Sequence, residues 1–259
     1  MRSLLIFLYN LKGGFFKRII PSILRKKIFF SKNKIIDIGS CEISLNLSNS
    51  IDREIYLKGF YEKEQIEYLY KISKNEKIDY FLDVGSYIGY YSLFFKNIKN
   101  VHAFEPNKEN YKHLQKNIEI NNANIVTHNI ACSEYSTHKI IWYTDKNKMG
   151  GSSIYNKNDP ELLKYKKEDI KFEKIDAKKL DDIIDIKNNN VLIKIDVERH
   201  EIDVLKGACE KILRNNNVIM QIEIQEDLKN RVFNFLEKNN FKLINSIRHD
   251  YYFKNYPKN

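Results

Sequence analysis

The chain has 259 residues, of which 42% are hydrophobic and 30% are charged, and this composition excludes a collagenous or wholly disordered protein. Such a length accommodates one large domain with additions. Three widely spaced cysteines without a CxxC zinc pattern fit a reducing compartment, and no apolar run approaches the roughly 20 residues of a membrane-spanning helix. We therefore expect a cytoplasmic globular protein.

The net charge of +10 is concentrated at the N-terminus. Residues 1–36 contain nine Lys or Arg and no acid, which leaves 35 bases against 34 acids in the rest of the chain. A near-neutral main part removes the electrostatic argument for a nucleic-acid partner, and we expect none.

Residues 1–34 form a basic arm in which Leu, Ile and Phe alternate with Lys and Arg. One interpretation is an amphipathic segment that makes a peripheral contact with the anionic inner face of a membrane through residues 1–30. The other interpretation, which we favour, is a helical extension that packs on the main domain. Amphipathicity does not reveal what the apolar face meets, so both stay open.

Residues 35–78 are expected to form strands and a helix that pack on the core. Three short apolar runs, at 35–39, 41–47 and 53–57, predict strands, and the spacing of apolar residues in Lys63–Lys74 predicts a helix.

From residue 79 to 259 the pattern alternates between strands and helices. The predicted strands are Tyr80–Val84, Val101–Phe104, Ile125–Ile130, Val191–Val197 and Val218–Ile224, and the predicted helices are Tyr90–Lys96, Lys108–Asn121, His200–Arg214 and Leu228–Lys238. Short apolar runs separated by helices predict an α/β domain with a mostly parallel sheet and helices on both faces. Two further runs, Phe241–Ile247 and Tyr251–Phe253, predict a closing antiparallel strand. An insertion at about 139–175, which starts with a predicted strand at Lys139–Thr144, is expected on the substrate side.

The first strand of this alternation leads into a candidate nucleotide site. Its end, Asp83, is followed by Gly85 and Gly89 around a turn that opens a helix with free N–H donors. Tyrosines at 87 and 90 break the dinucleotide fingerprint, and no GK[ST] follows. The pattern therefore favours a nucleoside without a pyrophosphate.

A second acid supports that interpretation. Glu105 ends the next strand, 22 residues after Asp83, where a carboxylate can accept hydrogen bonds from both ribose hydroxyls. The alternative is that the glycines only form a turn and that Glu105 is a solvated cap. The pair of signals favours an adenosine-type ligand.

Four segments together resemble the FkbM-type S-adenosylmethionine-dependent methyltransferases: DVGSYIGYYSL (83–93), FEPNKENYKHLQKNI (104–118), GGSS (150–153) and KIDVERHEIDVLKGA (194–208). The resemblance extends over roughly residues 45–225. It implies a class I methyltransferase (Rossmann-like) fold, S-adenosylmethionine as cofactor, and O-methylation, often of sugars in bacterial glycans or of natural products.

The resemblance also implies roles for individual residues. Asp83, Gly85 and Gly89, with Ser86 between them, would hold the methionine part of the cofactor, and Glu105 would hold the ribose. The segment 129–131, with Asn129 and Ile130, would lie beside adenine, and Glu62 with Tyr61 would reach the cofactor or the acceptor. In place of the family's Gly-Ala after KIDVE the chain has Arg199-His200, two large polar residues that must either alter the substrate pocket or face away from it.

Acidic residues gather at the ends of two later strands. Asp196 and Glu198 have the same strand parity, and Glu223 lies on the next strand. One mechanism uses Glu198 or His200 as general base, with Lys194 orienting a carboxylate. The other uses Asp196, Glu198 and Glu223 to hold a divalent metal ion that binds the substrate hydroxyls, and crowded like charges favour it. A structural Lys194–Asp196 pair is the alternative to both.

The substrate side offers Trp142 for stacking on a sugar, and Gly150, Gly151, Ser152 and Ser153 as hydrogen-bond donors. From the family resemblance we expect methylation of a sugar hydroxyl, on a nucleotide-linked hexose or heptose for a bacterial capsule or other surface glycan. The alternatives are a non-sugar small-molecule hydroxyl, or a non-catalytic scaffold with a membrane-docking arm.

Overall fold

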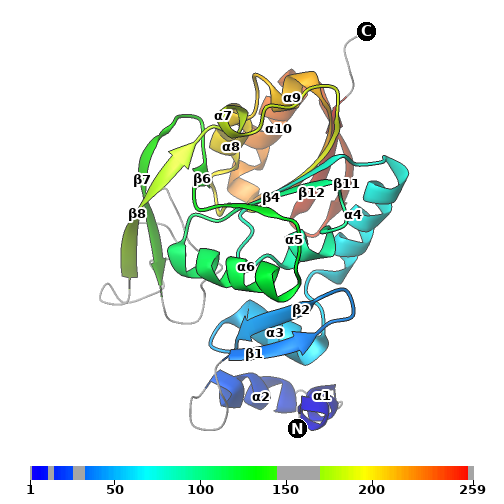
Figure 1. The fold of residues 1–259 in the computed structure, drawn as a ribbon, viewed down its shortest axis with the longest axis vertical. Coiled ribbons are helices and arrows are strands. Elements are labelled where there is room, and N and C mark those ends of the chain that lie inside the picture. The colour runs from blue at the N-terminus through cyan, green and yellow to red at the C-terminus, as the bar shows by residue number, and fades with distance from the viewer. Residues whose placement is uncertain (1, 11–14, 26–32, 145–169, 256–259) are drawn as a thin grey trace.

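The computed structural model describes residues 2–10, 15–25, 33–144 and 170–255. At its centre lies a seven-stranded sheet with the order β11-β12-β10-β9-β3-β4-β5 (Figure 1). Its strands are β3 (Tyr80–Val84), β4 (Asn100–Phe104), β5 (Val126–His128), β9 (Asn190–Ile195), β10 (Asn217–Glu223), β11 (Phe241–Ile247) and β12 (Asp250–Asn255). The first five run parallel, while β12 is antiparallel to both β10 and β11. The expected mostly parallel sheet with a closing antiparallel strand is confirmed.

Successive residues of the central strands enter two different cores. On β9, Val191 and Ile193 belong to one hydrophobic cluster and Leu192 belongs to the other. The first cluster is covered by α7 (Leu180–Ile183), α8 (Glu201–Gly207), α9 (Ile212–Asn215) and α10 (Lys229–Lys238), and the second by α3 (Ser50–Lys58), α4 (Lys63–Asn75) and α5 (Tyr90–Phe94). Since side chains alternate along a strand, this explains the continuous apolar runs.

Two sequence predictions about secondary structure are wrong. Residues 53–57 continue α3 instead of forming a strand, because buried positions at Asp52, Ile55 and Tyr56 follow helical spacing. The single helix predicted for His200–Arg214 is divided into α8 and α9.

The N-terminal segment packs onto the domain as two helices. α1 (Arg2–Asn10) and α2 (Phe15–Arg25) lie at the lower end of the molecule in Figure 1, next to the hairpin of β1 (Asn33–Asp37) and β2 (Glu42–Asn46). Ile20 and Leu24 of α2 are buried in the second cluster. The described helices include none with the length and apolar character needed to cross a bilayer.

The insertion forms a small separate sheet with the order β6-β8-β7. It consists of β6 (Ala131–Cys132), β7 (Thr137–Thr144) and β8 (Ile170–Lys178), and β7 pairs antiparallel with β8. This hairpin extends away from the main sheet, next to the amino end of α6 (Lys108–Ile120) (Figure 1). Gly150, Gly151, Ser152 and Ser153 lie outside the described residues.

Candidate active site

The register of the main sheet builds a polar row at the carboxyl ends of its strands. Asp83 of β3 pairs with Lys194 of β9, which pairs with Gln221 of β10, which pairs with Tyr252 of β12. These four side chains share one face of the sheet, because residues directly opposite on neighbouring strands point the same way. All four are buried. A polar row inside an otherwise apolar core is costly unless its groups are paired or used, so it marks a candidate site.

Lys194 is the cation at the centre of this row. Its Nζ donates to Asp196 Oδ2 at 2.9 Å and lies 4.6 Å from the centre of the Tyr91 ring. Burial opposes its charged form, but the carboxylates of Asp196, Asp83 and Glu62 outweigh burial and raise the pKa of Lys194 above its usual value. Lys194 is therefore charged and holds Asp196, a contact that fits both an oriented carboxylate and the structural pair that was the alternative.

The carboxyl groups of Asp196 and Glu223 lie close to each other at the ends of β9 and β10. The charge of Asp196 raises the pKa of Glu223 well above its usual range, with burial, a hydrogen bond to Asp196 and the charge of Glu198 as further causes. Two carboxyl groups this close do not both ionise easily, so Glu223 carries a proton at neutral pH. The predicted convergence of acids at this edge is thus present, as a pair that shares one proton.

The loop before α4 covers this carboxyl pair. Tyr91 donates from its hydroxyl to Glu62 Oε2 at 2.7 Å, and Glu62 itself has a left-handed backbone with φ of 46°. Burial raises the pKa of Tyr61 above its usual range, and the charges of Glu62, Asp196 and Glu223 raise it further. Tyr61 and Glu62 therefore face the same cluster, and their contact with cofactor or acceptor stays a prediction.

Two amides fix the far side of the cluster. Asp250, directly opposite Glu223 on β12, accepts from Gln221 Nε2 at 2.7 Å and from Gln65 Nε2 at 3.0 Å. Sequence analysis did not single out these three residues. The available signal was a lone glutamine inside the apolar run of β10.

The glycine turn after β3 is packed against the end of β9. Gly85 has φ of +84°, and a Cβ at this position would lie 1.8 Å from the backbone oxygen of Asp196. That oxygen cannot move away easily, because Asp196 N donates to Val84 O at 3.0 Å. Gly89 also has φ of +84°, and its Cβ would meet Leu114. Both predicted glycines are thus required, by backbone conformation and by close approach.

Buried polar atoms at this turn lack partners. Asp83 Oδ2 accepts from Ser92 N at 3.0 Å and from Ser92 Oγ at 2.6 Å, whereas Asp83 Oδ1 has no hydrogen-bond partner among the described residues. The same is true of Ser86 Oγ. Such unpaired buried groups cost free energy, which a ligand with polar groups of its own would recover.

Glu105 anchors the loops on both sides of it. Its Oε2 accepts from Tyr87 N at 2.9 Å, and its Oε1 accepts from Asn107 N at 2.9 Å and from Asn110 Nδ2 at 3.4 Å. Burial raises the pKa of Glu105 to about 7, although these hydrogen bonds oppose the shift. Each carboxylate oxygen has two lone pairs, so room for one further donor remains, on Oε2. The alternative of a solvated cap is excluded, because Glu105 is buried.

Asn129 supports the same loop from the end of the neighbouring strand. Its Nδ2 donates to Glu105 O at 2.9 Å and to Pro106 O at 3.0 Å. Ile130, the next residue, is partly buried against the first hydrophobic cluster. These contacts place Asn129, which is predicted to lie beside adenine, next to Glu105, which is predicted to hold the ribose.

The turn after β9 is strained where the sequence departs from the family pattern. Glu198 and Arg199 have φ of 48° and 78°, and Arg199 donates from its guanidinium to Asp227. Non-glycine residues in this region cost about 1–3 kcal/mol each and cluster at functional sites. Arg199 thus points to Asp227, before α10.

His200 links α8 to the insertion. Its buried ring lies 3.1 Å from Ser133 Oγ and 3.5 Å from Lys139 Nζ, both measured from Nε2. Burial lowers the pKa of His200 to about 3, with a further contribution from Lys139, so the ring is neutral at neutral pH. Its role as a general base stays a prediction.

The predicted metal site does not form. In the described part of the chain, no three His, Cys, Asp or Glu side chains make a group suited to a metal ion, and Asp196, Glu198 and Glu223 all lie within that part. The physical reason is that Lys194 already neutralises Asp196, and Asp196 shares a proton with Glu223. A divalent ion would have to displace both the Lys194 ammonium and the proton of Glu223.

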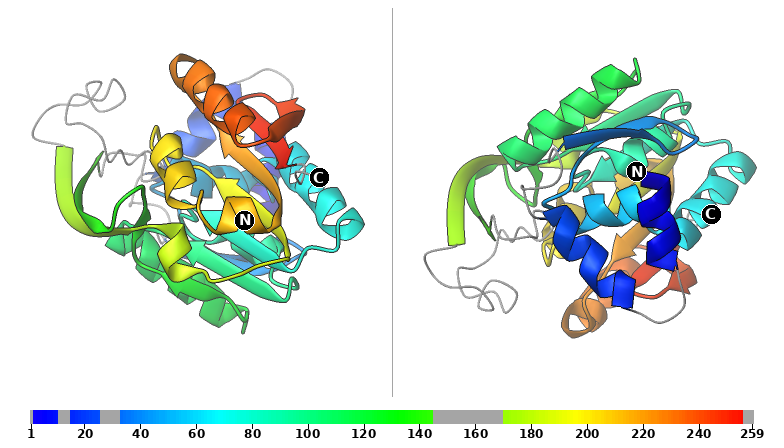
Figure 2. Two further views of the ribbon diagram at one scale, coloured as in Figure 1. Left: turned by 90° about the horizontal axis from the view of Figure 1, so that it is seen from above. Right: turned by 90° about the horizontal axis from the view of Figure 1, so that it is seen from below.

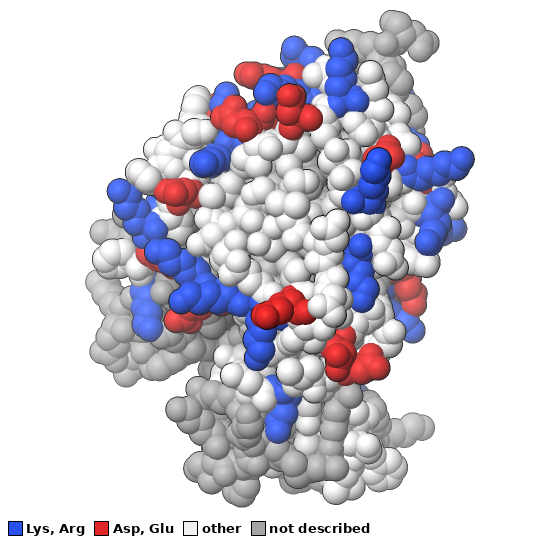
Figure 3. Space-filling view, in the orientation of Figure 1, with Lys and Arg blue, Asp and Glu red and all other residues white. Residues whose placement is uncertain are grey.

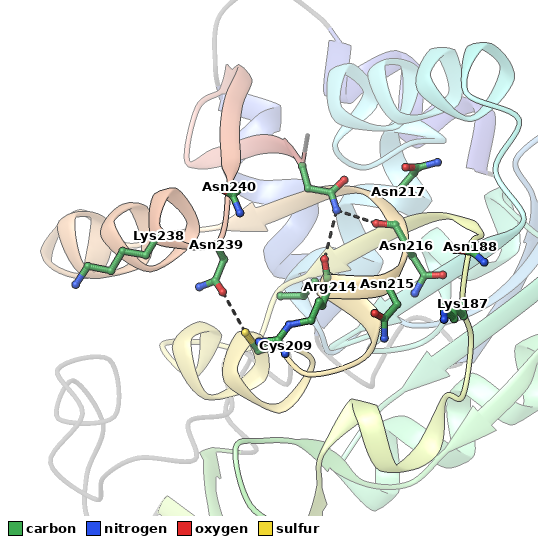
Figure 4. A pocket seen from close by; sticks show the side chains of 12 residues that line it. Lys187, Asn188, Cys209, Arg214, Asn215, Asn216, Asn217, Lys238, Asn239 and Asn240 are labelled. Atoms are coloured by element: carbon green, nitrogen blue, oxygen red, sulfur yellow. Dashed lines mark hydrogen bonds between the residues drawn. The ribbon is translucent and has the colours of Figure 1, made fainter. Parts of the chain in front are cut away.

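A cavity of about 740 Å³ lies at the opposite, amino ends of β9 and β10 (Figure 4). Asparagines line it, and two of them serve the local turns: Asn216 Nδ2 donates to Ile186 O at 3.1 Å, and Asn255 Nδ2 donates to Asn216 O at 2.8 Å. Ligands of open α/β sheets bind at the carboxyl ends of the strands. This cavity therefore lies between turns at the opposite end of the strands from the candidate site.

Of Trp142, the structure describes only the backbone, in β7.

The chain has been compared with known proteins at three levels. The family model for the methyltransferase FkbM domain matches residues 83–243. No match is found among functionally curated proteins. Similar solved structures include M. jannaschii tRNA m1G37 methyltransferase, with 12% identity, coverage of 96% of this chain and 70% of that chain, and a TM-score of 0.47. M. jannaschii TYW2 in complex with AdoMet has 13% identity, coverage of 88% and 87%, and a TM-score of 0.45.

A third solved structure is the ribosomal protein L11 methylase of Lactobacillus delbrueckii subsp. bulgaricus, with 13% identity, coverage of 76% of this chain and 81% of that chain, and a TM-score of 0.44. These similarities are too distant to transfer the substrates of those proteins to this chain.

The sheet order, with β9 at its centre, β3 beside it and β12 antiparallel, is that of a class I S-adenosylmethionine-dependent methyltransferase-like α/β fold. The family match covers more than half of the chain and includes the glycine turn, Glu105 and the carboxyl pair. The chain belongs to the FkbM methyltransferase family.

Proposed function

We propose that the protein is an O-methyltransferase that transfers the methyl group of S-adenosylmethionine to a sugar hydroxyl. The observation that carries the proposal is the carboxyl pair of Asp196 and Glu223, which lies at the strand ends next to the glycine turn. The proposed acceptor is a nucleotide-linked hexose or heptose of a bacterial capsule or other surface glycan, and the proposed location is the cytoplasm.

The cofactor site fits this proposal. Asp83 Oδ1 and Ser86 Oγ are buried and unpaired, and they lie at the turn where the family places the methionine part. Gly85 and Gly89 let the backbone approach a ligand closely, and Glu105 Oε2 retains acceptor capacity for one ribose hydroxyl. In this proposal Asn129 and Ile130 border the adenine, and Glu62 borders the methionine end.

Asp196 is the proposed general base. Lys194 fixes its orientation, and protonated Glu223 leaves Asp196 as the carboxylate that can take a proton. The bound cofactor supplies an electrophilic methyl group, whose bond to sulfur breaks as the bond to the acceptor oxygen forms. Asp196 receives the hydroxyl proton in that step, while Lys194 holds the Asp196 carboxylate in position.

Hydroxyl acceptors suit this cluster because its exposed members are hydrogen-bond acceptors. Asp196 is 30% exposed on its side chain, while Lys194 behind it is 5% exposed. A sugar offers several neighbouring hydroxyl donors to such a carboxylate edge. Glu198 adjoins the cluster, as its effect on the pKa of Glu223 indicates. Trp142 and residues 150–153 remain proposed sugar contacts.

Surface charge supports a small acceptor over a nucleic acid. On the face shown in Figure 3, Lys and Arg alternate with Asp and Glu around a largely uncharged centre. Recognition of a phosphate backbone relies on a continuous basic surface. A non-sugar hydroxyl and a non-catalytic scaffold remain the alternative proposals.

The test is a methyl-transfer screen with S-adenosylmethionine and a panel of nucleotide-linked sugars, monitored by mass spectrometry for a gain of one methyl group. We expect one class of nucleotide sugar to be methylated on oxygen. Asp196→Asn should abolish transfer but retain binding of S-adenosylhomocysteine, because Asn cannot take the proton. Wild-type activity in Asp196→Asn, or methylation of nitrogen or carbon only, would contradict the proposal.

A further inference from the structure

Helix α1 has apolar side chains on both of its sides. Leu5, Leu8 and Tyr9 pack against the second hydrophobic cluster, which is the expected inner face. On the other side, Leu4 and Phe7 are 59% and 61% exposed. A helix whose outer face meets only water normally carries polar residues there. The outer face of α1 therefore has the composition of a contact surface.

Helix α2 continues this surface and adds positive charge. Ile20 and Leu24 are buried, whereas Ile23 is 37% exposed and Lys17 is exposed. Figure 2 shows α1 and α2 side by side at the same end of the molecule in the view from below. Leu4, Phe7 and Ile23, together with Lys17, are called the docking face below.

Charge identifies the occupant of the docking face. Residues 1–36 carry nine bases and no acid, although the rest of the chain is close to neutral. If a second copy bound here in a symmetric dimer, each basic segment would face its equal and repel it. A bilayer with anionic headgroups accepts apolar side chains at its interface and attracts Lys and Arg at the same time. Of these two occupants, a second copy and a lipid surface, the lipid surface is the one that satisfies both the apolar and the basic character of the docking face.

We propose that the docking face binds the surface of an anionic lipid bilayer, with Leu4 and Phe7 inserted at the headgroup boundary. Binding of this kind depends on buried apolar area and on charge together, so removal of either should weaken it. The contact involves no residue of the proposed catalytic cluster. Docking and methyl transfer can therefore be tested separately.

The experiment is co-sedimentation of the full-length protein with vesicles. Vesicles that contain phosphatidylglycerol should bind the protein, and vesicles of phosphatidylcholine alone should bind much less. A double variant, Leu4→Ser with Phe7→Ser, should lose at least about tenfold in partitioning, because it removes the inserted apolar area. Raising salt from about 0.05 M to about 0.5 M should also weaken binding by screening the charge.

A matched control removes similar exposed apolar area elsewhere. Val126→Ser with Leu243→Ser changes side chains that are 49% and 47% exposed on β5 and β11, and it should leave vesicle binding unchanged. Equal loss in both double variants, equal binding to neutral and anionic vesicles, or no binding to either would overturn the proposal. Lys17→Glu is a second variant that leaves the apolar residues intact, and unchanged binding to anionic vesicles there would overturn the role of charge. A dimer in light scattering that the Leu4 and Phe7 changes dissociate would make a second copy the occupant.

Discussion

Substitution of Gly85 by alanine tests the contact that joins the glycine turn to β9. Two costs add at this position. Alanine at φ of +84° is strained by about 1–2 kcal/mol. Its Cβ would also lie 1.8 Å from Asp196 O, in a residue whose backbone N–H donates to Val84 O of β3, and overpacking of this kind costs about 1–3 kcal/mol.

Gly39 provides the matched control. It has φ of +88°, and a Cβ there would meet nothing within 4 Å. Gly39→Ala therefore carries the backbone strain without the collision. The difference in stability between the two variants isolates the close approach.

The assay is thermal unfolding followed by circular dichroism. A chain of this size loses roughly 3 °C in Tm per kcal/mol. For Gly85→Ala we expect a decrease in Tm of about 6–15 °C, from a loss of about 2–5 kcal/mol in the free energy of unfolding. For Gly39→Ala we expect a decrease in Tm of about 3–6 °C. We also expect Gly85→Ala alone to lose S-adenosylhomocysteine binding, since the turn and Asp196 must separate. Equal losses of Tm in both variants, with cofactor binding intact, would refute the close packing of the turn on β9.

Three further predictions concern the charged groups. Glu223 has a raised pKa in the folded state, so its proton stabilises the folded protein at low pH. This contribution to the free energy of unfolding is lost as pH rises from the pKa of Glu223 in the unfolded chain toward its pKa in the folded protein. Glu223→Gln should therefore flatten the fall in stability between about pH 5 and about pH 8 in urea unfolding; an unchanged pH slope would count against the shared proton. Lys194→Met should cost about 3–5 kcal/mol at neutral pH, because it leaves buried carboxylates uncompensated, and a loss below about 1 kcal/mol would show that they are solvated. Glu105→Gln should weaken S-adenosylhomocysteine binding by about 10–100-fold, since hydrogen bonds to a charged group contribute about 1.5–3 kcal/mol; an unchanged Kd by calorimetry would remove Glu105 from the ribose site.

The sequence predicts those parts of the fold that depend on short-range patterns. β3 has the bounds that its apolar run indicated, and the turn glycines and Glu105 lie where the spacing placed them. The strand predicted for residues 53–57 is wrong, because a run of five residues rich in apolar side chains fits a strand and a helix equally well.

The polar row across the sheet could not be predicted in the same way. It depends on the register of β3, β9, β10 and β12, which are distant in sequence. The bond between Gln65 and Asp250 joins residues 185 positions apart. The metal prediction failed for a related reason: it counted three acids and did not count the proton that two of them share.

The most direct test of the whole account is calorimetric titration of the purified protein with S-adenosylhomocysteine. We expect saturable binding at one site per chain without added metal ion, because Lys194 already neutralises the Asp196 carboxylate. Absence of binding at millimolar ligand would contradict it, and the fold would then have to serve a role other than methyl transfer.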